Sequence, residues 1–184
     1  GSLAPTPPPP HLRPSPMEHT MSSMADLPPI HPAPPDFDRW AALHRLLVLS
    51  FSGMEGRIDP PSSLTSLSAS DLEQMSRTQV LLLGIGASGD PVACAYLRPE
   101  PDALYLGKVA IHPDLRGRGL LHHIIAAAEA EARRLGRKTL ELETRIELIE
   151  NHAAFSAAGF RQVAERAHPG FDHPTSLIFR RPVA

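Results

Sequence analysis

Residues 109–121 read Val109-Ala110-Ile111-His112-Pro113-Asp114-Leu115-Arg116-Gly117-Arg118-Gly119-Leu120-Leu121. An apolar strand here runs into a basic loop, and an amphipathic helix follows the loop. Gly117 and Gly119 have no Cβ, so the backbone can turn tightly and approach a ligand closely. The first N–H groups of a helix have no partner within it, and the helix dipole is positive at that end. With Arg116 and Arg118, these groups predict a site for phosphate or pyrophosphate. A tight turn with solvated arginines is the alternative.

This loop follows neither of the widespread phosphate-binding motifs, G-x-x-x-x-G-K-S/T and G-x-G-x-x-G. It resembles motif A of the GCN5-related N-acetyltransferases, the GNAT superfamily, whose pattern Q/R-x-x-G-x-G/A falls on residues 116–121. Leu121 departs from the Gly or Ala of that pattern. The preceding residues 104–113 resemble the fourth strand of the family and its exit.

A second match lies downstream in the stretch Asn151-His152-Ala153-Ala154-Phe155-Ser156-Ala157-Ala158-Gly159-Phe160. This stretch resembles the segment N-x-x-x-Y/F-x-x-x-G-F of the same family. The resemblance covers about residues 28–184 and implies the acyl-CoA N-acyltransferase fold. In that mixed α/β fold, helices flank a central, mostly antiparallel sheet whose fourth and fifth strands splay apart.

Hydrophobic periodicity and turn residues predict the element order ααβββαβαββ. The first helix is expected to be capped by Asp36 or Asp38 and to end near Ser50. Residues 53–70 are expected to form a loop, and Ser70 or Asp71 to open a helix that ends near Thr78. Further helices are predicted over 121–135 and 151–158. Strands are predicted over 80–85, 91–97, 102–111, 138–145, 160–167 and 175–182.

The prolines divide the chain. Of its 21 prolines, 14 lie within the first 61 residues, where they oppose both helix and sheet. We expect residues 1–27 to form a flexible proline-rich tail, in part derived from cloning because Gly1-Ser2 is typical of tag removal. Residues 28–184 are expected to form a single N-acetyltransferase domain.

Composition restricts the function classes. The formal net charge of −2 gives no sign of a nucleic-acid partner. The chain lacks an apolar stretch of the roughly 20 residues that cross a bilayer, and its N-terminus lacks the apolar core of a signal peptide. No membrane association and a cytoplasmic location are therefore the expectation. Cys94, the single cysteine, lies in an apolar run and is expected to be buried and inert.

The resemblance also implies roles for the two motifs. Acetyl-CoA would bind between the splayed strands, and an amine would be its acceptor. Asn151 would contact the pantetheine arm or steady the next helix, and helix capping is its alternative role. Backbone groups of Val109, Ala110 and Ile111 would bind the pantetheine, and the N–H groups of Arg116, Gly117, Arg118, Gly119, Leu120 and Leu121 would bind the pyrophosphate. A homodimer is compatible with the resemblance.

Acetyl transfer to an amine needs a group that removes a proton, because a free alkylamine with a pKa near 10 is protonated at neutral pH. Glu141, Glu143 and Arg145 share one strand face by the period of two. Glu143 is closer to the expected splay and is the preferred base or substrate-orienting group. The alternative is a solvated or salt-bridged strand face, and Glu147 and Glu150 are weaker candidates for the base.

Phe155 stands where the family commonly has a tyrosine that protonates the leaving thiolate. Water, His152 or Tyr105 would have to replace it, or the protein binds acyl-CoA without efficient transfer. Loop residues His168 and His173, with Arg145, are expected to bind substrate.

No metal is expected, because the loop 168–173 offers three ligands without a fourth. The sequence therefore predicts an acetyl-CoA-dependent N-acetyltransferase that moves the acetyl group directly, in a ternary complex, to a primary amine of a small molecule or peptide. The main alternative is a catalytically weak acyl-CoA-binding regulatory or interaction module. A phosphate-binding or RNA-contacting domain that uses the loop 116–118 is a third hypothesis.

Overall fold

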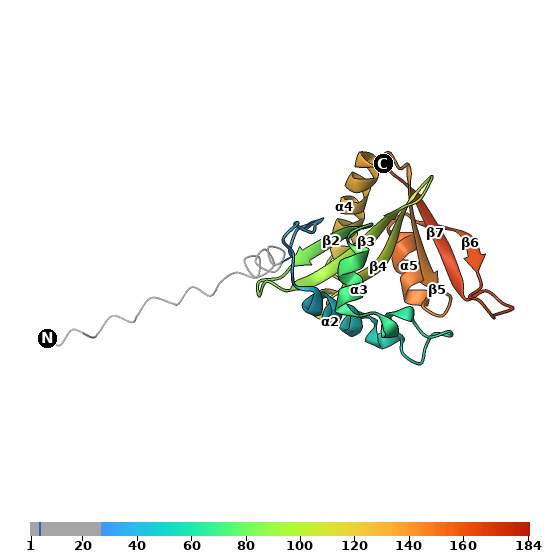
Figure 1. The fold of residues 1–184 in the computed structure, drawn as a ribbon, viewed down its shortest axis with the longest axis horizontal. Helices are drawn as coiled ribbons and strands as arrows, with labels where there is room; N and C mark the ends of the chain where they lie inside the picture. Colours follow the sequence, from blue (N-terminus) through green and yellow to red (C-terminus); the bar gives the residue numbers. More distant parts are fainter. Residues whose placement is uncertain (1–3, 5–26) are drawn as a thin grey trace.

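The computed structural model describes residue 4 and residues 27–184 (Figure 1). The expected tail over 1–27 falls almost wholly outside the described residues. The strands are β1 (Ile30–Pro32), β2 (Val80–Ile85), β3 (Pro91–Pro99), β4 (Leu104–Ile111), β5 (Thr139–Arg145), β6 (Arg161–Arg166) and β7 (Ser176–Pro182). The helices are α2 (Trp40–Phe51), α3 (Ala69–Met75), α4 (Leu120–Arg134) and α5 (Ile149–Ala157), and 3-10 turns cover η1 (Ser52–Met54), η2 (Ser63–Ser66) and η3 (Pro113–Leu115).

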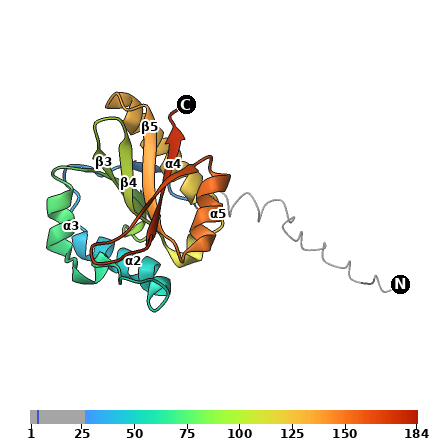
Figure 2. The same cartoon turned by 90° about the vertical axis from the view of Figure 1, so that its right-hand side faces the viewer.

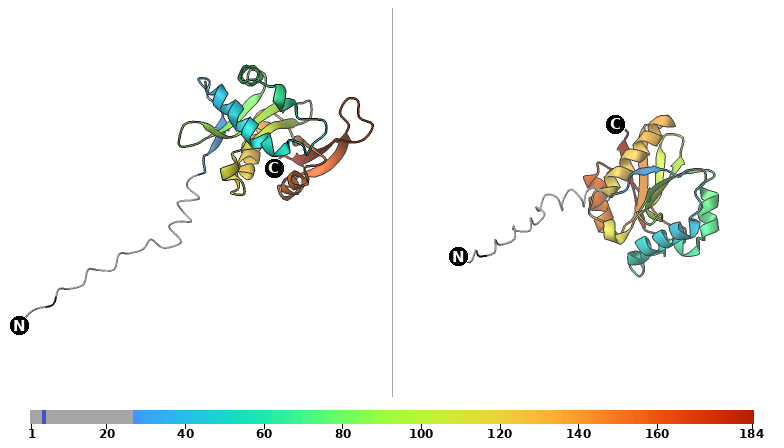
Figure 3. Two further views of the ribbon diagram at one scale, coloured as in Figure 1. Left: turned by 90° about the horizontal axis from the view of Figure 1, so that it is seen from below. Right: turned by 90° about the vertical axis from the view of Figure 1, so that its left-hand side faces the viewer.

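The described strands form one seven-stranded sheet in the order β1-β2-β3-β4-β5-β7-β6. Strands β4 and β5 pair in parallel, and the other neighbours pair antiparallel. Strand β1 lies at one edge of the sheet and the β6–β7 hairpin at the other (Figure 3). The predicted fold class, a mixed and mostly antiparallel sheet flanked by helices, is therefore confirmed.

Helices cover both faces of the sheet (Figure 2). On one face, α4 buries the stripe Leu120, Ile124, Ala128 and Ala132 against β3, β4, β5 and β7. On the other face, Leu43, Leu46 and Leu47 of α2 and Leu72 of α3 pack against Tyr96, Cys94 and Ala110. The central strand β3 is buried on both faces, which explains its continuous apolar run.

Two sequence predictions at the N-terminal side are wrong, and one strand there was missed. Helix α2 begins at Trp40 and has no side-chain cap, so neither Asp36 nor Asp38 caps it. Helix α3 is capped by Ser68, whose hydroxyl accepts from the backbone of Asp71 while the Asp71 carboxylate accepts from the backbone of Ser68. Asp71 thus completes a capping box from the third helical position and does not open the helix. The short strand β1 was not predicted at all.

Strands β4 and β5 separate after three paired positions. Their pairing covers Leu104 with Leu140, Tyr105 with Glu141 and Leu106 with Leu142, and it extends no further. Beyond this point β4 carries a bulge, because Gly107 lies opposite Tyr96 but Ala110 lies opposite Cys94. Lys108, within the bulge, has the left-handed φ of 49°. The predicted splay of the fourth and fifth strands is therefore present.

Candidate active site

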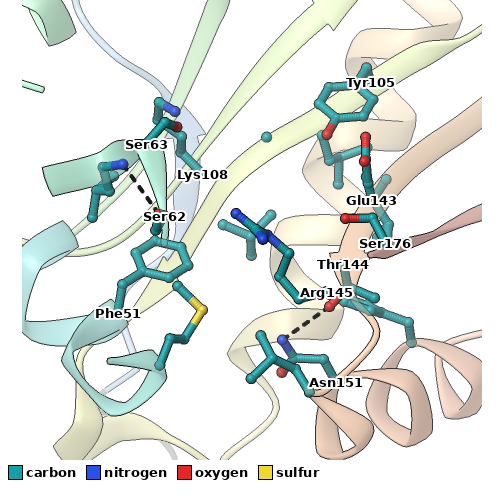
Figure 4. Close-up of a pocket in the computed structure, with 18 of the residues that line it drawn as sticks. Phe51, Ser62, Ser63, Tyr105, Lys108, Glu143, Thr144, Arg145, Asn151 and Ser176 are labelled. Atoms are coloured by element: carbon teal, nitrogen blue, oxygen red, sulfur yellow. Dashed lines mark hydrogen bonds between the residues drawn. The ribbon is translucent and has the colours of Figure 1, made fainter. Parts of the chain in front are cut away.

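Two cavities lie at this splay. The first, which we call the sheet cavity, has a volume of about 300 Å³ and lies beside the diverging ends of β4 and β5 (Figure 4). The second, the loop cavity, has a volume of about 310 Å³ and lies between the end of α2 and the starts of α4 and α5. Both cavities are lined by Phe51, Met54, Val109, Leu148, Asn151 and Phe155. The two cavities therefore adjoin at the splay.

Phe155 lines both cavities. Its ring is supported by Phe160 and Phe179, with ring centroids 6.1 Å and 6.4 Å away. These contacts fix the ring where the cavities meet. A phenylalanine has no hydroxyl, so Phe155 can shape this junction but cannot donate a proton there.

The loop that joins η3 to α4 borders the loop cavity. Arg116 and Leu121 line this cavity, and the Arg116 guanidinium donates to the carbonyl oxygen of Ser50 at 2.8 Å. Gly117 and Gly119 have φ angles of 73° and 92°, and a Cβ on either would meet no atom within 4 Å. Glycine is therefore favoured at both positions by the left-handed backbone conformation and not by a lack of space, because the space beside them is open. Helix α4 begins directly after Gly119, so its unpaired N–H groups face the same region.

The backbone of β4 borders the loop cavity from the other side. Val109 and Ile111 line it, whereas the Ala110 side chain is buried in the core beneath α2. Asn151 does not cap its helix, because α5 begins at Ile149 with Leu148 at the N-cap position. The capping alternative is wrong. The Asn151 amide instead donates to the Thr144 hydroxyl at 3.4 Å, which ties α5 to β5 beside both cavities.

Glu143 lines the sheet cavity, on the same strand face as Glu141 and Arg145. Its carboxylate forms an ion pair with Arg166 of β6 at 3.6 Å, and its side chain keeps 19% of its exposure. A salt-bridged strand face was the alternative role for Glu143, and the ion pair is present. The carboxylate nevertheless reaches the cavity, beside Tyr105 (Figure 4).

Tyr105 also lines the sheet cavity, and the Arg98 guanidinium lies over its ring at 4.5 Å from the centroid. Burial, with a smaller contribution from the Glu143 charge, raises the pKa of the Tyr105 phenol to about 12. The phenol is therefore protonated at neutral pH and can donate a hydrogen bond or a proton. His152, the other candidate donor, bonds through Nε2 to the carbonyl oxygen of Arg145 at 2.9 Å and lines neither cavity.

Of the three residues predicted to bind substrate, two line the sheet cavity and the third lines neither cavity. Arg145 and His168 line the sheet cavity. Arg145 donates to the carbonyl oxygens of Pro60 and Pro61 at 2.7 and 3.3 Å, and the His168 backbone donates to the Thr175 hydroxyl at 2.9 Å. His173 pairs with Asp172 on the exposed part of the loop and lines neither cavity.

The weaker candidates for the base do not face the sheet cavity. Glu150 pairs with Arg57 at 2.7 Å across the loop cavity, and this guanidinium lowers the pKa of Glu150 to about 2. Glu147 lines neither cavity, and its Oε2 atom is buried without a hydrogen-bond partner among the described residues. Glu143 is thus the carboxylate that the sheet cavity contains.

The sequence model of the acetyltransferase (GNAT) family matches residues 40–160. The chain belongs to the GNAT family. The match includes the loop 116–121, strands β4 and β5, and helix α5 with the residues that follow it up to Phe160. A search of curated protein sequences found no match to this GNAT chain.

Solved structures share the GNAT fold. The ribosomal-protein-S18-alanine N-acetyltransferase of Escherichia coli is 19% identical, with 84% of this chain and 93% of that chain covered and a TM-score of 0.60. A GCN5-related N-acetyltransferase of Rhodopseudomonas palustris is 18% identical, with 84% and 95% covered and a TM-score of 0.64. A GNAT acetyltransferase of Elizabethkingia anophelis with acetyl-CoA bound is 15% identical, with 83% and 96% covered and a TM-score of 0.58.

Sequence reasoning missed part of this GNAT site. The segment 51–64, which was expected to be mainly a connecting loop, contributes to both cavities: Phe51 and Met54 line both, Ser62, Ser63 and Leu64 line the sheet cavity, and Gly53 and Arg57 line the loop cavity. Lys108 lines the sheet cavity and was not considered. Its signal in the sequence was a lone charge, after a glycine, within the apolar strand 104–111.

Two general expectations concern metals and membranes. Among residue 4 and residues 27–184, no group of three His, Cys, Asp or Glu side chains has the arrangement of a metal site. Within the same part of the chain, no helix is both long and apolar enough to span a membrane.

Proposed function

We propose that this GNAT protein transfers the acetyl group of acetyl-CoA directly, in a ternary complex, to a primary amine of a small molecule or peptide. The meeting of the two cavities at the splay carries this proposal. One cavity is bordered by a loop suited to phosphate, and the other contains a carboxylate and a protonated phenol. An acyl donor and an amine can therefore meet beside Phe155.

The loop cavity suits an elongated donor that carries phosphate. The N–H groups of residues 116–121 would bind the pyrophosphate, with the helix dipole of α4 adding to the attraction. The backbone at Val109 and Ile111 and the amide of Asn151 would contact the pantetheine arm. When bound, acetyl-CoA supplies an acetyl thioester that an amine can attack.

The sheet cavity would hold the amine and move the protons. Glu143 would accept a proton from the acceptor ammonium, directly or through water, so that the nitrogen can form the new C–N bond. As the C–S bond breaks, the leaving sulfur needs a proton, and Tyr105 is a protonated donor in this cavity. Holding donor and amine in contact in a reactive geometry can lower the barrier by on the order of 7–11 kcal/mol.

Two measurements test the proposal. Calorimetry measures acetyl-CoA binding, and release of free thiol in the presence of single primary amines measures transfer. We expect binding together with amine-dependent thiol release. Binding without thiol release from any amine would favour the alternative that Phe155 motivates, a catalytically weak acyl-CoA-binding module. Absence of binding would refute both.

A further inference from the structure

The bulge in β4 brings an uncompensated cation into the sheet cavity. Because the bulge inserts one residue, Val109 packs against the α4 core at the border of both cavities, while Lys108 lines the sheet cavity. A left-handed φ of 49° is costly for a residue with a Cβ. Bulges commonly re-aim a side chain beside an active site, and such strain is typical of functional positions. The strand thus accepts strain at the position that places a lysine in the cavity.

Lys108 has no carboxylate to balance it. Its carbonyl oxygen accepts from the Cys94 thiol at 3.4 Å, but within residues 27–184 its ammonium forms neither an ion pair nor a hydrogen bond. Burial, and then the nearby Arg98 guanidinium, lower the pKa of the Lys108 ammonium. An anionic group beside the ammonium would offset both costs.

The cavity as a whole carries an excess of positive charge. Glu143 is already paired with Arg166, and Arg145 donates only to the neutral carbonyl groups of Pro60 and Pro61. An acceptor amine arrives as a further cation. An acceptor that is only cationic would therefore increase an existing excess, whereas an acceptor with an added negative charge would reduce it.

The cation and the carboxylate lie apart. Lys108 is on one side of the cavity with Ser62 and Ser63, and Glu143 is on the other side with Tyr105 (Figure 4). Ser62 and Ser63 add hydroxyl donors on the Lys108 side. A molecule with an amine at one end and a carboxylate at the other matches this separation of charge.

We propose that the acceptor is an aminocarboxylate whose carboxylate binds Lys108 and whose amine lies toward Glu143. This inference rests on the proposed function, because it assigns the substrate class of the same site. It makes Lys108 a specificity-determining residue that binds the end of the acceptor opposite the reacting nitrogen.

The test compares molecules that differ only in the carboxylate. The acceptor pairs are β-alanine with propylamine, γ-aminobutyrate with butylamine, and δ-aminovalerate with pentylamine. Thiol release gives kcat/KM for each. We expect the best aminocarboxylate to exceed its alkylamine at least tenfold, which is the size of one charge-assisted contact. In Lys108→Met or Lys108→Gln this ratio should fall toward one through KM, while Lys108→Arg should retain most of it.

Lys138 supplies the matched control. It is the other lysine of the chain, is exposed and lines neither cavity. Lys138→Met should keep the ratio of the unchanged protein. Equal kcat/KM within every pair, or a ratio that survives in both Lys108→Met and Lys108→Gln, would overturn the inference. A fall in kcat that is equal for both members of a pair would also overturn it, because Lys108 would then act on the amine.

A binding measurement separates this inference from the proposed function. N-acetyl-γ-aminobutyrate and N-butylacetamide mimic the two products and can be titrated by NMR into the protein saturated with coenzyme A. Tighter binding of the carboxylate probe, lost in Lys108→Met and kept in Lys138→Met, supports the carboxylate site even if no amine gives thiol release. Equal binding of the two probes refutes the carboxylate site even if amines are acetylated.

Discussion

Substituting valine for Gly119 should abolish tight binding of acetyl-CoA while the fold persists. Gly119 is the N-cap of α4, has a φ of 92° and is exposed, and a Cβ at this position would meet no protein atom within 4 Å. The substitution therefore causes no clash inside the protein. It strains the left-handed backbone and puts a side chain in the open space where a pyrophosphate would approach the N–H groups.

The other end of the same helix offers a matched control. Gly136, which follows the C-cap of α4, has a φ of 69°, is exposed, and also has no atom within 4 Å of an added Cβ. A left-handed residue with a side chain costs roughly 1–2 kcal/mol at either position. For a domain of this size, that cost lowers the melting temperature by about 2–4 °C per kcal/mol. Gly119→Val and Gly136→Val should therefore be destabilised to a similar degree.

Only Gly119→Val should affect the cofactor. Losing a single hydrogen bond from a backbone N–H to a phosphate oxygen costs about 1.5–3 kcal/mol, which is about a 10- to 150-fold loss of affinity. Isothermal calorimetry on both variants, at a temperature where each is folded, measures this loss. Unchanged affinity in Gly119→Val would refute the assignment of the loop, and an equal loss in Gly136→Val would show that strain alone causes it.

Three further predictions address the chemistry and the core. Glu143→Gln should reduce turnover about 10²–10⁴-fold with acetyl-CoA affinity nearly constant; a lowered melting temperature with normal turnover per folded molecule would show a structural role. Phe155→Tyr should raise the rate of thiol release if protonation of sulfur limits turnover, and an unchanged rate with intact affinity would mean that Tyr105 or water suffices. Burial raises the pKa of the Cys94 thiol from 9.0 to about 12, so its protonation stabilises the fold below about pH 9 and this contribution is lost as the pH rises toward 12. The melting temperature should therefore fall over this range more steeply than in Cys94→Ala, and parallel curves would contradict it.

Long periodic elements were predictable because the pattern of apolar residues along the chain is enough to indicate each of them. The apolar run of β2 was predicted with the bounds that the structure shows, Val80–Ile85. The stripe of α4 was predicted from its helical spacing. Strand β1 was missed because it is three residues long, ends in Pro32 and exists through its pairing with β2 at the edge of the sheet. Such an element has no pattern of its own.

The cap of α3 shows a different kind of failure. Ser68, Ser70 and Asp71 are all residue types that cap helices, and composition alone does not rank them. The structure selects Ser68 because only this choice places Asp71 at the third helical position, where its carboxylate bonds back to the Ser68 backbone. The decisive quantity is a reciprocal pair of hydrogen bonds, which a search for single capping residues does not detect.

The candidate site was also predictable only in part. The residues expected to bind the cofactor lie in one strand–loop–helix segment and in α5, so short motifs could indicate them. The sheet cavity is built from segments that are distant in sequence; Arg145 and Pro60, whose contact holds its wall, are 85 residues apart. Lys108 enters it only because a bulge adds one residue to β4, and alternation in a regular strand would have turned that residue away.

The segment that borders the sheet cavity also borders the loop cavity, which favours binding of acetyl-CoA before the acceptor. Phe51 and Met54 line both cavities. The segment that follows them is held at the sheet cavity by the bonds from Arg145 to Pro60 and Pro61, and at the loop cavity by the exposed pair Arg57–Glu150. An exposed ion pair contributes little to stability. Contacts with a pantetheine arm would therefore add to the forces that position this wall, and the acceptor would then meet a cavity already bounded on that side. In the proposed direct transfer, an amine that enters after acetyl-CoA would therefore reach Glu143 with the thioester already in place.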